Sequence, residues 1–320
     1  MTVLLVPHHP IAPLDDEHVD RIRSVTSEEV MVCRDTQAAP GLAAKARVIF
    51  GDLRPDIVDA AATAAWIQYV GAGADRVVAQ VRSLGRSVRV VSAKGLVGPQ
   101  LAEHAFALLL SLTRGVARAI RSPGFAQRVP IRLSQWELTD RTFLILGLGG
   151  AGREVARRAR GFGVAHTIGI DPFASNVGDL VDELVPLDAL DRALGRADVV
   201  ILTLPLTPRT AGLFDPARFA AVRDGAILIN VSRGGIVEDA ALVEALRSGR
   251  LAGAGLDVTQ VEPLPSDHPL WSFDNVVITP HIAGGSPLRE ERLVQQFCAN
   301  LEREQQGQPL LGVVSLEEGF

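Results

Sequence analysis

Lysine is almost absent from this chain. Of its 320 residues only Lys45 and Lys94 are lysine, so arginine carries nearly all of the positive charge. The net charge is −5 and the sequence pI is about 5.8, which leaves no basic surface of the kind by which proteins bind nucleic acids. The two cysteines, Cys33 and Cys298, are too few and too isolated for a disulfide framework or a metal site. We therefore expect no nucleic-acid partner and no bound metal.

Long apolar runs are also missing. No run approaches the roughly 18 residues that a membrane-spanning helix needs. Residues 1–6 form a short apolar stretch that meets Pro7, without the basic start and the longer apolar region of a signal peptide. These absences predict a soluble, cytoplasmic protein with no membrane partner, and the length allows two domains with a full core each.

A glycine-rich segment organises the middle of the chain. Residues 143–146 are an apolar run, as expected of a strand that is buried on both faces. The G-x-G-x-x-G pattern of Gly147, Gly149 and Gly152 follows, where a tight turn would bring backbone amides close to a pyrophosphate. Residues 153–160 are helix formers, so the anion would lie at a helix N-terminus, where unpaired amides and the dipole favour it.

An acid stands at the expected distance from these glycines. A second predicted strand ends at Asp171, about 20 residues on, where a carboxylate accepts hydrogen bonds from an adenosine ribose. The carboxylate would repel a 2′-phosphate, and residues 172–174 supply no cation, so NAD is favoured over NADP. Glycine triplets alone also occur in merely structural turns. The order strand, glycines, helix, strand and acid favours a dinucleotide site.

Short apolar runs alternate with helical segments along the whole chain, which indicates an α/β fold with parallel sheets. The predicted strands are residues 3–6, 30–32, 48–50, 66–70, 88–91, 199–202, 226–231, 253–258 and 276–279. The main predicted helices are residues 15–23, 99–120 and 288–303, and residues 121–138 are predicted to be irregular. One domain thus precedes the glycine-rich segment, and the chain returns to it at its end.

Three polar residues directly follow the last three predicted strands: Arg233, Glu262 and His281. The carboxyl ends of parallel strands meet at one edge of a sheet, where ligands bind. Hydride transfer to a 2-keto acid needs a cation for the carboxylate and carbonyl, a proton donor, and a carboxylate that orients the donor and keeps it protonated. Singly, such an Arg could cover a turn and such a His could be a solvated loop residue. Together, beside a nucleotide site, they favour catalysis.

These segments resemble the D-isomer-specific 2-hydroxyacid dehydrogenase family. The similarity spans nearly the whole chain and is densest between residues 102 and 284. The most specific matches are the glycine pattern, Leu204 to Thr210, Asn230 to Gly235, Asp257 with Val261 to Pro265, and Pro280 to Gly284.

The resemblance implies a fold and a set of roles. It implies two doubly wound parallel-sheet domains, a Rossmann cofactor domain of residues 97–284 inserted into a flavodoxin-like substrate domain of residues 1–96 and 285–320. Arg233 would bind the substrate carboxylate and carbonyl, His281 would be the acid/base, and Glu262 would support it. The substrate carboxylate would also be held by backbone amides of the loop Val70, Gly71, Ala72 and Gly73. NAD would contact Gly147, Gly149, Gly150, Ala151, Gly152, Asp171, Leu204, Pro205, Val231, Ser232, Asp257 and Gly284.

The chain also departs from the family pattern. Gly150 and Ala151 stand where Arg and then Ile or Val are usual, so the phosphate site would rely more on backbone amides. Residues 91–95 lack the frequent Asn-Thr-Pro and include Lys94, which either meets the distal end of the substrate or is a solvated loop lysine. Glu262 disfavours the formate dehydrogenase branch of the family, because that branch carries Gln at this position. The end at Phe320 leaves no room for the regulatory domain of many phosphoglycerate dehydrogenases.

The expected function is the NAD(H)-dependent reduction of a small 2-keto acid to a D-2-hydroxy acid, or the reverse. Two alternatives stay open: an NADP-preferring glyoxylate/hydroxypyruvate reductase, and a non-catalytic, NAD-sensing binding protein like the transcriptional corepressors that share this fold and the same three polar residues. By resemblance, the protein is expected to be a homodimer, with the helix of residues 99–120 and the arm of residues 121–138 at the interface.

Overall fold

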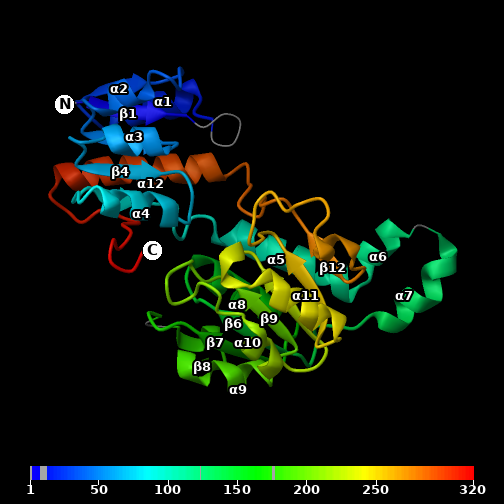
Figure 1. Ribbon diagram of the computed structural model, residues 1–320. Coiled ribbons are helices and arrows are strands. Elements are labelled where there is room, and N and C mark those ends of the chain that lie inside the picture. Colours follow the sequence, from blue (N-terminus) through cyan, green and yellow to red (C-terminus); the bar gives the residue numbers. More distant parts are fainter. Residues whose placement is uncertain (1, 8–12, 123, 175–176) are drawn as a thin grey trace. The chain divides into compact units, whose positions relative to one another are not determined.

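The computed structural model describes residues 2–7, 13–122, 124–174 and 177–320; Met1 and Pro123 of the segments discussed above lie outside these ranges. The chain forms two compact units, one of Met1–Val97 with Ser286–Phe320 and one of Gly98–Gly285. Each unit has its own parallel sheet with helices on both faces (Figure 1). The predicted fold class is confirmed.

The first unit contains a five-stranded sheet in the order β2-β1-β3-β4-β5, with all neighbours parallel. Its strands are β1 (Thr2–Val6), β2 (Glu29–Val32), β3 (Val48–Gly51), β4 (Trp66–Tyr69) and β5 (Arg89–Val91). Its helices are α1 (Asp16–Ser24), α2 (Ala39–Ala43), α3 (Pro55–Ala60), α4 (Asp75–Ser83) and α12 (Arg289–Gln305).

Successive residues of these strands point to opposite faces, so each face has its own apolar layer. One layer includes Leu4, Ile49 and Ile67 and packs against α2, α3 and α4. On the other face Phe50 stacks on Phe297 of α12 with ring centroids 4.7 Å apart, and Trp66 of β4 lies 5.2 Å from the same ring. Helix α12 therefore completes the core of a sheet formed by the first 97 residues.

The second unit contains a seven-stranded parallel sheet in the order β12-β11-β10-β9-β6-β7-β8. Its strands are β6 (Thr142–Leu146), β7 (His166–Ile170), β8 (Glu183–Val185), β9 (Val199–Leu202), β10 (Ala226–Asn230), β11 (Leu251–Leu256) and β12 (Val276–Ile278). Its helices are α5 (Gly98–Thr113), α6 (Val116–Arg121), α7 (Arg128–Ser134), α8 (Gly150–Gly161), α9 (Leu190–Leu194), α10 (Pro216–Ala221) and α11 (Asp239–Arg247).

Alternation again divides the core of this unit. Leu144 and Leu146 of β6 belong to the layer covered by α9, α10 and α11. Phe143 and Ile145 of the same strand belong to the layer covered by α5 and α8. Both layers are fully buried, which explains why the central strands read as continuous apolar runs in the sequence.

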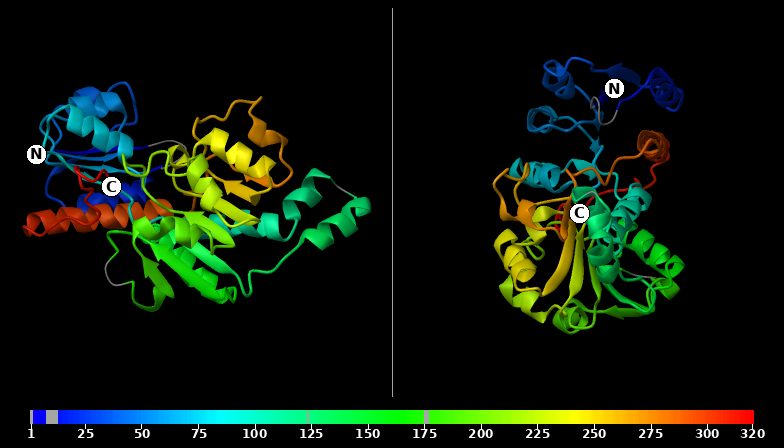
Figure 2. Two further views of the ribbon diagram at one scale, coloured as in Figure 1. Left: turned by 60° about the horizontal axis from the view of Figure 1, so that its bottom comes forward. Right: turned by 90° about the vertical axis from the view of Figure 1, so that its right-hand side faces the viewer.

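The segment between α5 and β6 differs from the prediction. The helix predicted over residues 99–120 is broken, because Gly115 adopts a left-handed conformation (φ +68°) between α5 and α6. The stretch of residues 121–138, predicted to be irregular, contains α7 and a short 3₁₀ turn. Figures 1 and 2 show α6 and α7 extending as an arm from the rest of their unit. Strand β8 at the sheet edge was not predicted; its three residues are too short for a pattern.

None of the helices in the described ranges is long and apolar enough to cross a membrane.

Candidate active site

The glycine loop between β6 and α8 has the geometry of an anion cradle. Gly147 has φ +93°, and a β-carbon at Gly152 would lie 1.8 Å from the carbonyl oxygen of Gly147. Both positions therefore require glycine. A β-carbon at Gly149 would meet nothing within 4 Å, so the backbone is open there. Helix α8 begins at Gly150 rather than at the predicted Arg153, so its N-terminus lies within the loop, where it favours an anion.

A cation lies beside this loop, although the usual arginine within it is missing. Arg153 donates from Nε to the carbonyl oxygen of Leu148 over 2.9 Å. Its guanidinium is thus anchored at the loop and could assist the amides in binding a phosphate. From the sequence, Arg153 is predicted only as a helix former, since its reach back to Leu148 depends on where α8 begins.

Asp171 connects the glycine loop to the end of β7. Its Oδ2 accepts the Leu148 amide at 2.7 Å, and its Oδ1 accepts the Phe173 amide at 2.8 Å. A carboxylate has about four acceptor positions, so two remain for ribose hydroxyls. The fixed orientation of this carboxylate and the open backbone at Gly149 together fit a dinucleotide.

Four further predicted cofactor residues follow β9 and β10. Leu204 and Pro205 come after β9, and Val231 and Ser232 come after β10. The preceding Thr203 was not predicted to contribute, yet its hydroxyl donates to the carbonyl oxygen of Gly147 over 2.7 Å and so fixes the glycine loop. Gly284, another predicted cofactor contact, accepts a long hydrogen bond of 3.4 Å from Gln100 of α5 through its carbonyl.

Glu262 and His281 lie side by side. Nδ1 of His281 is 2.8 Å from Oε2 of Glu262, and Oε1 of Glu262 accepts the Thr259 amide at 3.2 Å. Because a carboxylate accepts, Nδ1 carries a proton, and Nε2 is the atom that can exchange one with a ligand. The His281 side chain is 51% exposed, so a ligand can reach it.

Arg233 follows β10, the strand beside β11, while His281 follows β12 on the other side of β11. Nη1 of Arg233 donates to the carbonyl oxygen of Ser232 over 2.8 Å. The turn that presents it is shaped by Asn230, whose Nδ2 donates to the Arg233 carbonyl and whose Oδ1 accepts from the Ser232 amide. Asn230 is only 1% exposed. In the sequence Asn230 is only part of a motif, because its two bonds depend on the turn geometry.

Asp257 holds the turn that carries His281. The Asp257 side chain is 2% exposed. Its Oδ1 accepts from the Thr279 hydroxyl at 2.6 Å and the Ile282 amide at 2.9 Å, and Oδ2 accepts the Ala283 amide at 2.9 Å. The Asp257 carbonyl accepts the His281 amide at 2.9 Å. These bonds maintain His281 at φ +55°, a conformation that costs energy for a residue other than glycine.

The Asp257 carboxyl stays ionised despite its burial. Burial alone would raise its pKa. Hydrogen bonds from His104, Thr279 and the amides of Ala283 and Ile282 lower the pKa by more than burial raises it, so it lies below the ordinary value. From the sequence, Asp257 is predicted only as a cofactor contact. Its structural partners are 22 or more residues away in the chain, so no local pattern identifies them.

The predicted carboxylate loop, residues 70–73, lies in the first unit after β4. Its start is fixed by Arg289 of α12, whose Nη2 donates to the Val70 carbonyl over 2.8 Å, and the Gly71 carbonyl accepts the Ala93 amide at 2.9 Å. A β-carbon at Gly71 would lie 2.4 Å from the Tyr69 ring, so a larger residue there would require this ring to move. Arg289 was not predicted to contribute. A small pocket beside Val70 is otherwise lined by Val6, Pro7, Leu14, Phe50, Gly51, Glu290 and Leu293.

Lys94 lies in the same unit, after β5. Its side chain is exposed, and its Nζ lies over the Phe320 ring, 4.9 Å from the ring centroid. The contact has the geometry of a cation–π interaction. Among the residues that the structure describes, no group of three or more His, Cys, Asp or Glu side chains is arranged to hold a metal ion.

The sequence of the chain is similar to those of known proteins. Residues 106–283 match the family model described as "D-isomer specific 2-hydroxyacid dehydrogenase, NAD binding domain". The hydroxypyruvate reductase of Thermotoga maritima is 37% identical over 252 residues, which are 78% of this chain and 80% of that protein. The D-3-phosphoglycerate dehydrogenase of Archaeoglobus fulgidus is 33% identical over 82% of this chain, but this chain spans only 49% of it.

Solved structures agree over both units. The D-isomer-specific 2-hydroxyacid dehydrogenase of Xanthobacter autotrophicus, in complex with NADPH and MES, matches with a TM-score of 0.81 and 27% identity over 99% of each chain. The NADPH-dependent glyoxylate/hydroxypyruvate reductase of Sinorhizobium meliloti, in complex with NADP and sulfate, matches with a TM-score of 0.81 and 26% identity over 100% of each chain. The chain belongs to the D-isomer-specific 2-hydroxyacid dehydrogenase family.

Proposed function

We propose that this protein is an oxidoreductase that reduces a small 2-keto acid to the D-2-hydroxy acid, or catalyses the reverse reaction, with NAD(H) as its cofactor. The observation that carries the proposal is the 2.8 Å contact between His281 and Glu262, at the edge of the sheet that also presents the glycine loop. In this proposal the unit of residues 98–285 binds the cofactor and carries Arg233, Glu262 and His281, and the other unit contributes backbone amides to substrate binding.

The residues have separate tasks in this reaction. The nicotinamide, when bound, supplies or accepts the hydride. Nε2 of His281 gives a proton to the carbonyl oxygen as charge develops on it, while Glu262 stabilises the protonated ring through Nδ1. Arg233 pairs with the substrate carboxylate and polarises the carbonyl. Backbone amides of residues 70–73 complete the carboxylate site.

NAD is the preferred cofactor in this proposal because of Asp171. Its carboxylate is fixed by two backbone amides and so cannot turn away from a 2′-phosphate without losing them. The competing candidate is an NADP-preferring glyoxylate/hydroxypyruvate reductase. It is favoured by the similar structures from Xanthobacter autotrophicus and Sinorhizobium meliloti, which are complexes with NADPH and with NADP.

A homodimer is also proposed, with residues 99–120 and the arm of residues 121–138 at its interface. Large apolar side chains of these two segments are exposed: Val116, Ile120, Phe125, Val129 and Leu133. Phe125 is 92% exposed and Leu133 is 81% exposed, as expected where a second subunit covers them. Sedimentation of the wild type should give a dimer, and the variant Phe125→Glu/Leu133→Glu should give monomers. A wild type that sediments as a monomer would refute the proposal.

Turnover with a panel of keto acids tests the function. Oxidation of NADH and of NADPH should be followed with glyoxylate, hydroxypyruvate, pyruvate, phenylpyruvate and branched keto acids, with Arg233→Met as the inactive control. Binding of NADH without turnover of any substrate would instead indicate a nucleotide-sensing binding protein. The predicted cytoplasmic location stays a prediction, which cell fractionation would test.

A further inference from the structure

His104 lies on α5, far in sequence from the catalytic turn that it touches. Its Nε2 is 2.8 Å from the hydroxyl oxygen of Thr279 and 3.3 Å from Oδ1 of Asp257. The His104 side chain is 19% exposed. So far this imidazole is only one of the donors that lower the pKa of Asp257, and the hydride-transfer chemistry assigns it no task.

The distances fix the direction of the hydrogen bonds. Thr279 and Asp257 are joined by a short contact of 2.6 Å, and an ionised carboxylate can only accept, so the Thr279 hydroxyl donates to Asp257. The hydroxyl has one proton, which this bond uses. Thr279 must therefore accept from Nε2 of His104, so that nitrogen carries a proton in the neutral as well as the charged ring.

This relay ends at the backbone of the catalytic turn. The Asp257 carboxylate accepts the amides of Ile282 and Ala283, and the Asp257 carbonyl accepts the amide of His281. If the first donor is lost, the Thr279 hydroxyl can rotate away and a buried carboxylate loses part of its compensation. The turn that maintains His281 at φ +55° would then loosen.

We propose that His104 is a positioning residue for the proton-transfer step: its Nε2–H orients Thr279 and Asp257, which hold the backbone of His281 in its reactive conformation. The kinetic part of this inference rests on the proposed function. The structural part does not, because it concerns the turn of residues 279–283 in the protein without any ligand.

Three variants separate the donor from simple packing. His104→Leu removes the donor, and His104→Gln places an amide N–H near the position of Nε2. His166→Leu is the matched control, because His166 of the same unit also pairs with an acid, Glu183 at 3.2 Å, away from the turn. Thr279→Val breaks the same relay at its second member and serves if His104→Leu does not fold.

Hydrogen exchange tests the structural part in the ligand-free protein. We expect the Ile282 and Ala283 amides to exchange about tenfold faster in His104→Leu or Thr279→Val, and at the wild-type rate in His104→Gln and His166→Leu. Unchanged exchange in both relay variants would overturn the proposal, whether or not the protein turns over a keto acid.

Steady-state kinetics tests the consequence for catalysis. We expect kcat of His104→Leu to fall about 10- to 100-fold, because a small displacement of a catalytic group costs this much. The KM for the keto acid should change less than threefold, and His104→Gln should restore most of kcat. An equal loss in His104→Gln would show that the donor is not the cause. If the wild type itself turns over no keto acid, the proposed function fails, and the exchange rates alone decide on the relay.

Discussion

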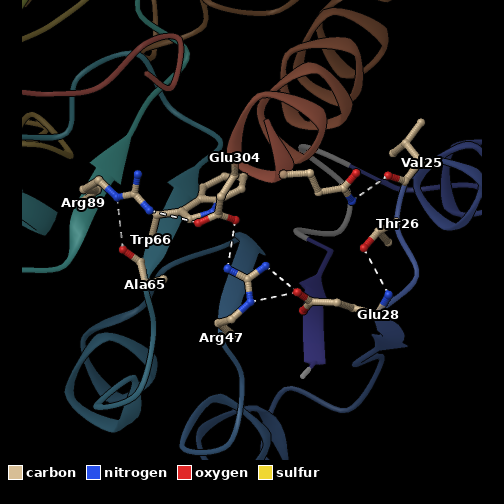
Figure 3. A network of polar contacts seen from close by, with 9 residues as sticks. Val25, Thr26, Glu28, Arg47, Ala65, Trp66, Arg89 and Glu304 are labelled. Carbon is tan, nitrogen blue, oxygen red and sulfur yellow. Dashed lines mark hydrogen bonds and ion pairs between the residues drawn. The ribbon is translucent and has the colours of Figure 1, made fainter. Parts of the chain in front are cut away.

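Two polar networks of this protein can be compared, one in each unit. At the amino ends of the strands of the first unit, Glu304 of α12 accepts from Nη1 of Arg47 at 2.9 Å, Nε1 of Trp66 at 2.8 Å and Nη2 of Arg89 at 2.9 Å (Figure 3). Arg47 also donates from Nε to Glu28 over 2.8 Å. Each charged side chain named here faces an opposite charge, and the network ties α12 to β4, to β5 and to the residue before β3.

The network around His281 is organised differently. The carboxylate of its buried member, Asp257, accepts three hydrogen bonds. His281 and Glu262 pair with each other and are otherwise accessible, with exposed fractions of 51% and 36%. The comparison separates two uses of hydrogen bonds. Saturated pairs hold elements together, whereas a reactive group is held through its backbone and keeps one polar atom for a ligand.

The largest predicted effect is the loss of kcat when His281, the reactive residue of the second network, is replaced. His281→Ala should lower kcat about 10²–10⁴-fold, the usual contribution of a positioned acid, while NADH binding and the free energy of unfolding change little. Stopped-flow turnover, NADH titration and urea unfolding measure the three quantities. A variant within a few-fold of wild-type activity would show that another group supplies the proton.

Breaking the network around Glu304 should have the opposite result: stability should fall and kcat should stay nearly unchanged. Glu304→Ala removes the acceptor of the Trp66 indole and one acceptor each of Arg47 and Arg89. We expect a loss of about 2 kcal/mol of unfolding free energy with kcat nearly unchanged. Glu302→Ala, on an exposed neighbouring position of α12, is the control and should cost less than about 0.5 kcal/mol. If Glu304→Ala and Glu302→Ala are equally stable, the network of Figure 3 contributes nothing to stability.

Acid should affect the network around His281 through Asp257. Because the folded-state pKa of Asp257 is lowered, its stabilisation is present above the ordinary carboxyl pKa of about 4 and is lost as the pH falls through the folded pKa. Asp257→Asn should therefore be less stable than wild type by about 1 kcal/mol at pH 7, and the difference should shrink below about pH 4.

A surface carboxylate provides the contrast for this acid titration. Hydrogen bonds from Arg196 and His166 lower the pKa of Glu183 to about 2, but solvent screens that exposed pair, so Glu183→Gln should change stability much less. Urea unfolding between pH 3 and pH 7 compares the two variants. A constant difference between Asp257→Asn and wild type across this range would exclude an ionised Asp257 as the stabilising group.

Cofactor choice should respond to Asp171 more weakly than kcat responds to His281. The variant Asp171→Ser/Phe173→Arg removes a negative charge and adds a positive one near the 2′-position of the ribose, and we expect the NADH:NADPH ratio of kcat/KM to fall about tenfold. Phe173→Arg alone separates the two contributions. A wild type that uses both cofactors equally would show that the charge of Asp171 does not select between them.

The smallest effect is expected for Lys94. If its ammonium meets the distal end of the substrate, Lys94→Ala should raise KM for hydroxypyruvate and dianionic keto acids more than for pyruvate. The variant also loses the contact of Nζ with the Phe320 ring, which should cost no more than about 1 kcal/mol of stability. Equal KM changes for all substrates, or none, would leave Lys94 as a surface residue.

What the sequence could predict follows from how far each interaction reaches along the chain. Fully buried parallel strands are continuous apolar runs, so β6, β9 and β10 could be predicted within about a residue. Glu262 and His281 follow two successive predicted strands, and these strands, β11 and β12, are neighbours in the sheet. Arg289 fixes Val70 across 219 residues, and the Asp257 bonds span 22 to 26 residues; such pairs have no local pattern. The break at Gly115 depends on a left-handed conformation that glycine permits but does not require.

The insertion of one unit into the other determines the order in which the newly made protein can fold. Synthesis delivers Gly98–Gly285 as one uninterrupted segment, before the Ser286–Phe320 segment that the first unit still needs. Until α12 leaves the ribosome, Phe50 and Trp66 lack Phe297, the ring against which they pack. The growing chain thus completes its second unit first and carries an uncovered aromatic face meanwhile, the kind of surface that chaperones bind.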